Sequence, residues 1–285
     1  MITPVLKDEA ILADVAEARR DWQDLHLWWL GQSGFLVQWQ NRHLLLDPYL
    51  SDSLTKKYAH TDKPHVRMTE RVVAPERLDF IDVVSSSHNH TDHLDPETLG
   101  PLLRANPKLG LIIPEANREF VADRLGMVTD IPIGLDVGES ATVAGFKFHA
   151  VPAAHELTDK DDQGRCRYLG YVIEFGPWTI YHSGDTVRYS GMAESLRNWR
   201  IDIALLPING RAPEKRVAGN LTGREAAVLA KEIQAALVIP CHYEMFEFNT
   251  ASPAEFVETA LQLRQPQQVL RCGERWTSGL HTVGR

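Results

Sequence analysis

The sequence predicts a four-layer α/β/β/α sandwich built from a single domain. In each half of the 285-residue chain, short strands joined by tight turns come first and strand–helix alternation follows. Two halves with this order indicate two sheets packed face to face with helices outside. No repeat, low-complexity run or linker divides the chain. We therefore expect residues 1–285 to form one domain, with a helical extension over residues 1–23.

The first half starts with a helix and closely spaced strands. Apolar residues recur at helical spacing over residues 10–23, which predicts an amphipathic helix. Turns at 31–34 and Gln40–Arg42 separate three expected strands, Leu25–Leu30, Phe35–Trp39 and His43–Asp47. Residues 48–80 are polar and lack a clear period, which is typical of a functional loop. The remaining expected elements are strands Ile81–Ser86 and Leu111–Pro114 and helices Pro96–Arg104, capped by Asp95, and Ala116–Leu125.

The second half repeats this order. Three strands are expected first, and the Gly176–Pro177 turn joins the last two: Phe146–Val151, Leu169–Phe175 and Trp178–His182. Thr222 and Glu225 form a capping box, which predicts that a helix begins there. The alternating elements are helices Met192–Trp199, Arg224–Gln234 and Pro253–Leu263 and strands Ile203–Pro207, Leu237–Pro240 and Val269–Arg271.

The composition excludes several classes of protein. The chain has 30 Lys and Arg against 38 Asp and Glu, a net charge of −8, which argues against a nucleic-acid binder. No stretch approaches roughly 18 consecutive apolar residues, so we expect no membrane span. The N-terminus lacks the pattern of a signal peptide. The three cysteines are widely spaced and form no CxxC pair, which favours a reducing cytoplasm over a disulfide framework.

Histidine and aspartate concentrate in one short segment. Within six residues lie His88, His90, Asp92 and His93. In an extended loop, side chains at positions i and i+2 point the same way, so His88 and His90 can reach one metal ion. If the chain then turns into a helix, Asp92 and His93 project beside them. Imidazole and carboxylate ligands together suit zinc, and also manganese or iron.

Three further candidate ligands follow predicted strands. His155, Asp185 and His242 each lie where a strand runs out, and functional sites of α/β folds collect at the carboxyl ends of strands. Each residue alone is a weak signal, because a histidine at a strand end commonly has only a structural role. Their joint occurrence behind the histidine-rich segment favours a metal site.

This combination of motifs resembles the metallo-β-lactamase superfamily. The resemblance rests on His88-Asn89-His90-Thr91-Asp92-His93 with Ser183-Gly184-Asp185-Thr186 behind it, and it covers residues 25–273. The segments 28–35 and 46–49 are similar to the ascorbate-6-phosphate lactonase branch and to the N-acyl-phosphatidylethanolamine phospholipase D branch. The lactonase branch lacks a histidine at the position of His155. The resemblance implies the α/β/β/α metallo-β-lactamase sandwich.

The resemblance also implies a two-metal centre. His88, His90 and His155 would bind one divalent ion, Asp92, His93 and His242 the other, and Asp185 would bridge both. Asp47 would orient the ligand loop. Zinc is the first expectation for both ions and manganese the alternative. A metal-bound hydroxide would then attack an ester, lactone, amide or phosphodiester of a small molecule, and Asp92 would orient it or pass a proton to the leaving group.

Substrate contacts are expected from a local basic cluster in the loop after residue 50. It includes Lys56, Lys57, Tyr58, His60 and Arg67, which suit a phosphate or carboxylate group; a solvated loop is the other interpretation. His182 is a candidate for catalysis or substrate contact, with a structural strand histidine as the alternative.

Other functions of the superfamily fit this chain less well. A phosphodiesterase of the phospholipase D type is the main alternative, although no membrane-binding segment is evident. Di-iron redox members usually carry glutamate where this chain has His90, and they need a flavin domain. Nucleases typically carry an extra arm, and a scaffold without activity would not need a complete ligand set. The N-terminal helix and the tryptophans at 22, 28, 29 and 39 leave room for a homo-oligomer contact.

Overall fold

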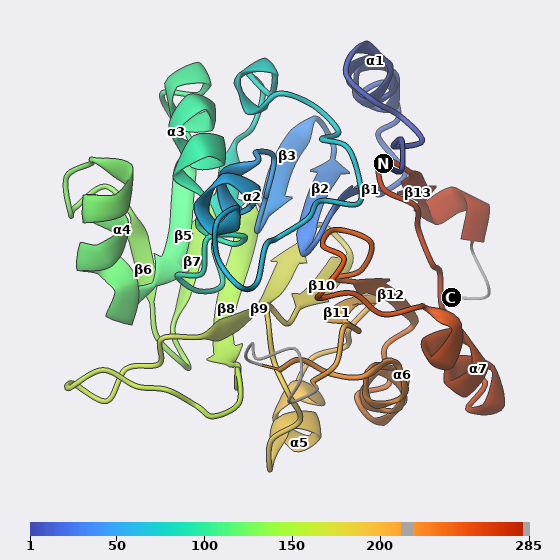
Figure 1. Cartoon of the computed structure of the whole chain (residues 1–285). Coiled ribbons are helices and arrows are strands. Elements are labelled where there is room, and N and C mark those ends of the chain that lie inside the picture. The colour runs from blue at the N-terminus through green and yellow to red at the C-terminus, as the bar shows by residue number, and fades with distance from the viewer. Residues whose placement is uncertain (212–218, 282–285) are drawn as a thin grey trace.

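The computed structural model describes residues 1–211 and 219–281 and contains two mixed β-sheets (Figure 1). The first sheet has seven strands in the order β13-β1-β2-β3-β4-β5-β6. β1 to β3 and β13 pair antiparallel, whereas β3 to β6 pair parallel. The strands are β1 His26–Gly31, β2 Gly34–Trp39, β3 Arg42–Leu46, β4 Val83–Ser85, β5 Gly110–Pro114, β6 Ile133–Leu135 and β13 Arg275–Thr277.

The second sheet has six strands in the order β12-β11-β10-β9-β8-β7. Its first four strands in sequence pair antiparallel, and β10, β11 and β12 pair parallel. Both sheets therefore start with antiparallel strands, followed by the strand–helix alternation that the sequence predicts, and the alternating strands pair parallel. The strands are β7 Ser140–Val143, β8 Phe146–Pro152, β9 Leu169–Phe175, β10 Trp178–His182, β11 Ile203–Pro207 and β12 Leu237–Cys241.

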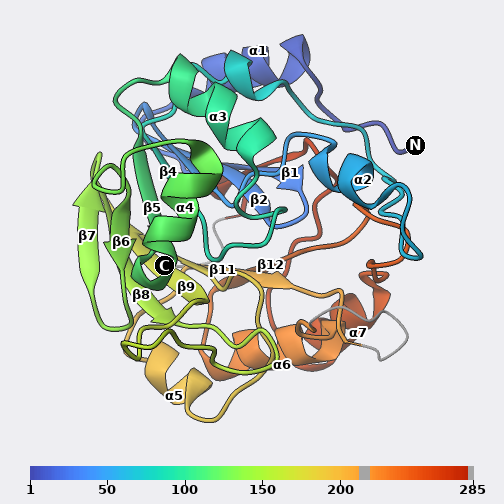
Figure 2. The ribbon, with the colours of Figure 1, turned by 60° about the vertical axis from the view of Figure 1, so that its left-hand side comes forward.

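Helices cover the outer faces of the two sheets. Figure 2 shows α1 and α3 on one side of the molecule and α5, α6 and α7 on the opposite side, with the strands between them. The helices are α1 Glu9–Ala18, α2 Ser53–Tyr58, α3 Pro96–Ala105, α4 Arg118–Leu125, α5 Met192–Leu196, α6 Gly223–Glu232 and α7 Ala254–Gln262, with 3₁₀ turns at Pro75–Arg77, Glu115–Asn117 and Ser278–His281. The predicted four-layer α/β/β/α sandwich is confirmed.

Local sequence signals explain several boundaries. Asp95 caps α3 by accepting a hydrogen bond from the backbone of Glu97, and Thr222 and Glu225 form the predicted capping box of α6. Between the sheets, buried residues of both, such as Leu45 and Ile180, belong to one hydrophobic cluster. This packing fixes the strand ends on which the site is built.

Some expected elements differ from the structure. The first helix ends at Ala18 and not at residue 23, because the Asp21 side chain accepts hydrogen bonds from the next backbone N–H groups and forms a turn. The final strand predicted at Val269–Arg271 is wrong. The chain turns between Arg271 and Glu274 and pairs with β1 only as β13. The sequence analysis missed α2, β6, β7 and β13.

Two of the four tryptophans proposed for a subunit contact belong to the core. Trp28 and Trp29 lie in β1 and are fully buried, so they cannot meet a partner, whereas Trp22 is 59% exposed. Within the described residues, no helix combines the length and the apolar character needed to cross a bilayer.

Candidate metal centre

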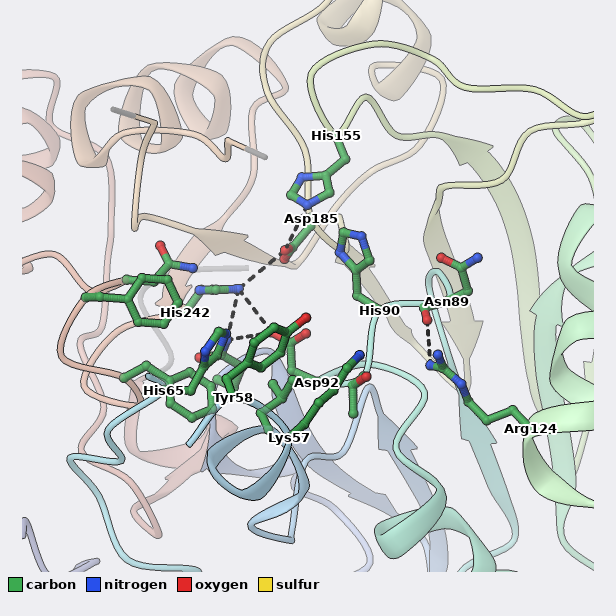
Figure 3. Close-up of a pocket in the computed structure, with 16 residues that line it drawn as sticks. Lys57, Tyr58, His65, Asn89, His90, Asp92, Arg124, His155, Asp185 and His242 are labelled. Carbon is green, nitrogen blue, oxygen red and sulfur yellow. Dashed lines mark hydrogen bonds and ion pairs between the residues drawn. The ribbon is translucent and has the colours of Figure 1, made fainter. Parts of the chain in front are cut away.

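The predicted ligands meet at one edge of the sandwich because each follows a strand that points to this edge. Asp47 follows β3, and the 88–93 segment follows β4, its parallel neighbour. In the second sheet, β8 and β10 both pair antiparallel with β9 and therefore run the same way, as does β12. His155, Asp185 and His242 follow these three strands, and Figure 3 shows them converging with His90 and Asp92.

The first group of ligands consists of His88, His90 and His155. One side-chain nitrogen of each lies within 4.8 Å of the others. Nδ1 of His155 donates to the carbonyl of Gly219 at 3.0 Å, so its lone pair is on Nε2. Nδ1 of His88 lies 3.0 Å from the Ser87 hydroxyl, and its buried Nε2 has no hydrogen-bond partner among the described residues.

The second group consists of Asp92, His93 and His242, whose ligand atoms also lie within 4.8 Å of one another. Asp185 lies between the two groups. Its Oδ1 is 3.4 Å from His93 Nε2, and its Oδ2 is 3.3 Å from His242 Nε2 and 3.8 Å from His155 Nε2. The carboxylate thus faces histidines of both groups, which is the arrangement that a bridging ligand requires.

Asp47 supports this arrangement from below. Its Oδ2 accepts the Nδ1–H of His93 at 2.6 Å, and its Oδ1 accepts the backbone N–H of Ser87 at 2.9 Å. The Ser87 hydroxyl also donates to Asp47. A carboxylate only accepts, so Nδ1 of His93 carries a proton and Nε2 is the nitrogen that faces the ligand group. This is the contact that commonly orients a metal-bound histidine.

Burial and the crowded charges act in opposite directions on these groups. Burial lowers the pKa of His88 well below its usual range and that of His90 to about 4, so both imidazoles are neutral and can act as ligands. Burial alone would raise the pKa of Asp185, but His242 and His93 lower it well below its ordinary value. For His93, burial opposes the charge, and Asp185 and Asp92 nevertheless raise its pKa well above normal.

The donor set fits transition-metal ions. His88 Nε2, His93 Nε2 and Asp185 Oδ1 are buried polar atoms without a hydrogen-bond partner among the described residues. Such atoms are costly unless something pairs with them. Imidazole nitrogens and carboxylate oxygens at this density suit zinc or manganese, so the residues present could hold the ions that the fold implies.

A pocket with a cavity of about 340 Å³ opens above the ligands. That volume suits a small molecule. One wall is aromatic, because Tyr58 stacks on His65 with ring centroids 4.1 Å apart and the His65 ring meets Phe246 and Phe248 at 5.3 and 4.4 Å. Arg124 lies on the opposite side and donates to the Asn89 carbonyl in the ligand loop at 2.7 Å (Figure 3).

The structure separates the residues predicted to bind substrate. Lys57 and Tyr58 line the pocket. Lys56 instead pairs with Glu97 at 2.7 Å, and the largely buried Arg67 donates to backbone carbonyls, including that of Thr69 at 2.6 Å. His60 is exposed and, like Lys56 and Arg67, is not among the residues lining the pocket.

His182 lies beneath the pocket. It is buried, and its Nε2–H donates to the Ser33 carbonyl at 3.1 Å; it does not line the pocket. The alternative interpretation, a structural strand histidine, matches this placement.

Sequence reasoning missed several residues at the site. Tyr168 packs its ring 5.0 Å from that of His88 and 5.5 Å from that of His155. Gln32 contacts both Asp92 and His242. His65, in the loop after α2, contacts the other three rings of the aromatic wall. The only advance signal was the position of Gln32 in a turn between two strands.

Comparison with known proteins identifies the family. The model of the β-lactamase superfamily domain matches residues 26–242. A UPF0173 metal-dependent hydrolase of Pelotomaculum thermopropionicum is 30% identical over 233 residues, 80% of this chain and 88% of that protein. A second, from Hyperthermus butylicus, is 27% identical over 229 residues, 80% of this chain and 87% of that protein.

Solved structures agree at the level of the fold. The metallo hydrolase Igni18 of Ignicoccus hospitalis has a TM-score of 0.65 at 22% identity, covering 90% of this chain and 98% of its own. An isothiocyanate hydrolase from Delia radicum gut bacteria has a TM-score of 0.69 at 21% identity, covering 89% and 98%. With its ligand-rich strand ends and the matching domain, the chain belongs to the metallo-β-lactamase superfamily as a metal-dependent hydrolase.

Proposed function

We propose that the protein uses two divalent metal ions, zinc or manganese, to hydrolyse an ester, lactone or phosphodiester bond in a small molecule. The observation that carries this proposal is the position of Asp185, whose two oxygens face histidines of both ligand groups. Each group also contains a buried nitrogen, His88 Nε2 in the first and His93 Nε2 in the second, that has no hydrogen-bond partner among the described residues, which is unfavourable unless an ion pairs with it.

The metal ions and the residues around them would have separate roles in the reaction. Bound ions would supply Lewis acidity and a lowered pKa of coordinated water. Asp92 reaches both the second ligand group and the pocket, so it can hold the attacking water and pass its proton to the leaving group. Asp47 keeps the lone pair of His93 directed at the site.

The pocket walls suggest the character of the substrate. The wall of Tyr58, His65, Phe246 and Phe248 suits an apolar or aromatic part. Lys57 stands beside it and suits a carboxylate or phosphate group. Among the branches of the superfamily, we propose the lactonase-like one because a small anionic substrate suits this pocket; the segment at 28–35 is similar to that branch and to the phospholipase D branch alike. We also propose a cytoplasmic location, where the three free cysteines stay reduced.

A hydrolase screen combined with metal analysis tests the proposal. Lactones, acyl esters and phosphodiesters would be compared on one preparation loaded with zinc or with manganese. Turnover of lactones or esters with close to two ions per chain is the expected result. Turnover of phosphodiesters alone would move the assignment to the phospholipase D type, and activity in metal-free protein would refute the mechanism.

Adjacent lysines offer a matched pair for the substrate contact. Lys57→Glu should raise KM for anionic substrates, because Lys57 lines the pocket. Lys56→Glu makes the same charge change on a residue that pairs with Glu97 outside the pocket and should leave KM unchanged. Equal effects of the two variants would argue for general electrostatics and against a contact.

A further inference from the structure

Gln32 occupies a strained turn that is tied to a ligand. It lies between β1 and β2 with a φ of 51°, in the left-handed region that residues other than glycine seldom adopt. Its backbone carbonyl accepts hydrogen bonds from the Trp29 indole at 3.0 Å and from the backbone N–H of His242 at 2.9 Å. These bonds fix the turn against the end of β12 and so direct the Gln32 side chain at the second ligand group.

The side-chain amide of Gln32 touches two of the three ligands in that group. Its Nε2 is 2.7 Å from Asp92 Oδ2 and 3.1 Å from His242 Nε2. Because a carboxylate only accepts, the amide must present its N–H to Asp92, and the same nitrogen lies against His242 Nε2. The residue is 1% exposed, and its Oε1 has no hydrogen-bond partner among the described residues. The two contacts of Nε2 therefore orient the side chain.

Among the described residues, no side-chain amide contacts Nε2 of His88 or of His155 in the first ligand group. Nε2 of His88 is buried and has no hydrogen-bond partner among the described residues, and His155 Nε2 faces only Asp185 at 3.8 Å. An ion entering the first group displaces no hydrogen bond from these atoms. An ion entering the second group must displace the Gln32 amide from Asp92 Oδ2 and from His242 Nε2.

We propose that Gln32 is a placeholder for the second metal ion. Its side-chain amide donates to Asp92 and contacts His242 while that ion is absent, which stabilises the half-loaded state. The first group then fills first, and the second ion binds more weakly than its ligands alone would allow. This inference rests on the proposed two-metal function, and it adds an order of loading and a residue that sets it.

Titration of the full-length, metal-free protein with Co²⁺, followed by absorbance and calorimetry, tests the placeholder. The wild type should bind two ions in separate steps, and His90→Ala should remove the step of the first group. Gln32→Leu should strengthen the second step about tenfold or more, since a hydrogen bond to a charged group is worth about 1.5–3 kcal/mol. Gln32→Asn, which withdraws the amide and tolerates a positive φ, should act in the same direction if the leucine variant folds poorly.

A second glutamine in the same hairpin provides the control. Gln38 in β2 is equally buried and lies outside the pocket, so Gln38→Leu should leave both steps unchanged. If Gln32→Leu leaves the second step unchanged or weakens it, the placeholder is refuted while two-metal binding stands. If the wild type binds only one ion at saturation, the two-metal function fails and the placeholder fails with it.

Discussion

Substitution of Asp47 by asparagine isolates the role of a residue that touches a ligand and not the substrate. In the native protein, Oδ1 of Asp47 accepts the Ser87 backbone N–H at 2.9 Å and Oδ2 accepts His93 Nδ1–H at 2.6 Å. An amide has only one accepting atom. If its oxygen keeps Ser87, its NH₂ meets His93 Nδ1, and the imidazole must move its proton to Nε2, the atom that faces the ligand group. If its oxygen keeps His93, the NH₂ meets the N–H of Ser87.

Either outcome weakens the second ligand group. Loss of a residue that orients a metal-bound histidine typically costs 10–100-fold in metal affinity, or about 1.4–2.7 kcal/mol. We expect this loss for one of the two ions in a Co²⁺ titration of Asp47→Asn, with the other step unchanged. The control is Asp202→Asn. Asp202 lies outside the site, and its carboxylate accepts the backbone N–H of Thr179 at 2.8 Å. Unchanged affinity in Asp47→Asn would refute the tautomer argument.

Three further predictions address the bridge, acid stability and backbone packing. Asp185→Ala should bind one ion fewer by metal analysis, and its kcat/KM should fall more than about a hundredfold. Turnover at the wild-type rate would refute the bridging role of Asp185. Burial, aided by Arg19, lowers the pKa of His43 to about 3, against about 6.5 when unfolded. The unfolded chain therefore binds the extra proton, and stability falls by up to about 5 kcal/mol as pH decreases through this window. His43→Phe should flatten that dependence in urea unfolding at pH 7 and 4.5, and an unchanged slope would exclude His43 as its source. Gly184→Ala should lower the free energy of unfolding by about 1–3 kcal/mol. The new Cβ would lie 2.6 Å from the Cβ of Ser87, and the backbone has a φ of 58° there. An unfolding temperature equal to that of the wild type would contradict this prediction.

Much of the fold could be predicted from the sequence because the patterns that indicate its elements are local. Short apolar segments separated by turns mark β1 to β3 and β8 to β10, and the capping box at Thr222 marks the start of α6. The short strands β6 and β7 are three and four residues long and only partly buried, so they carry little periodic signal. The edge strand β13 depends on pairing with β1 across the whole chain, a contact that no local pattern reports.

The sequence predicts those parts of the candidate site in which the residue type itself indicates the chemistry. Histidines and aspartates that follow several strands indicate metal ligands when they occur together. Gln32, Phe246 and Phe248 carry no such signature, and they reach the pocket only because β12 ends beside the turn that follows β1. Lys56 and Lys57 are equivalent in sequence, yet the helix α2 directs only Lys57 to the pocket. Orientation of this kind depends on tertiary structure.

Four of the eleven residues other than glycine with a positive φ among the described residues lie at the metal centre or next to it. These residues are Gln32 (φ 51°), Asp47 (38°), Glu156 (79°) and His242 (63°). His242 is a candidate ligand, Gln32 and Asp47 contact candidate ligands, and Glu156 follows one in the sequence. Residues other than glycine in such conformations cost of order 1–3 kcal/mol and persist only where the surroundings impose them. Here the surroundings are the packed sheets, because Asp47 donates its N–H to Ser85 in β4 and His242 donates its N–H to Gln32.

The source of this strain predicts how the fold responds to loss of metal. If packing and hydrogen bonds hold the turns, the ligands are already in place before any ion binds. The ions then bind more tightly, because no further ordering of the ligands is needed. The large buried core shared by both sheets then maintains the fold on its own, unlike small zinc domains that unfold without metal. Protein stripped with a chelator should keep its far-UV circular dichroism spectrum while losing activity, and both should return to the loaded values on adding Zn²⁺. Loss of the spectrum on chelation would show that the ions, and not the sheets, hold these turns.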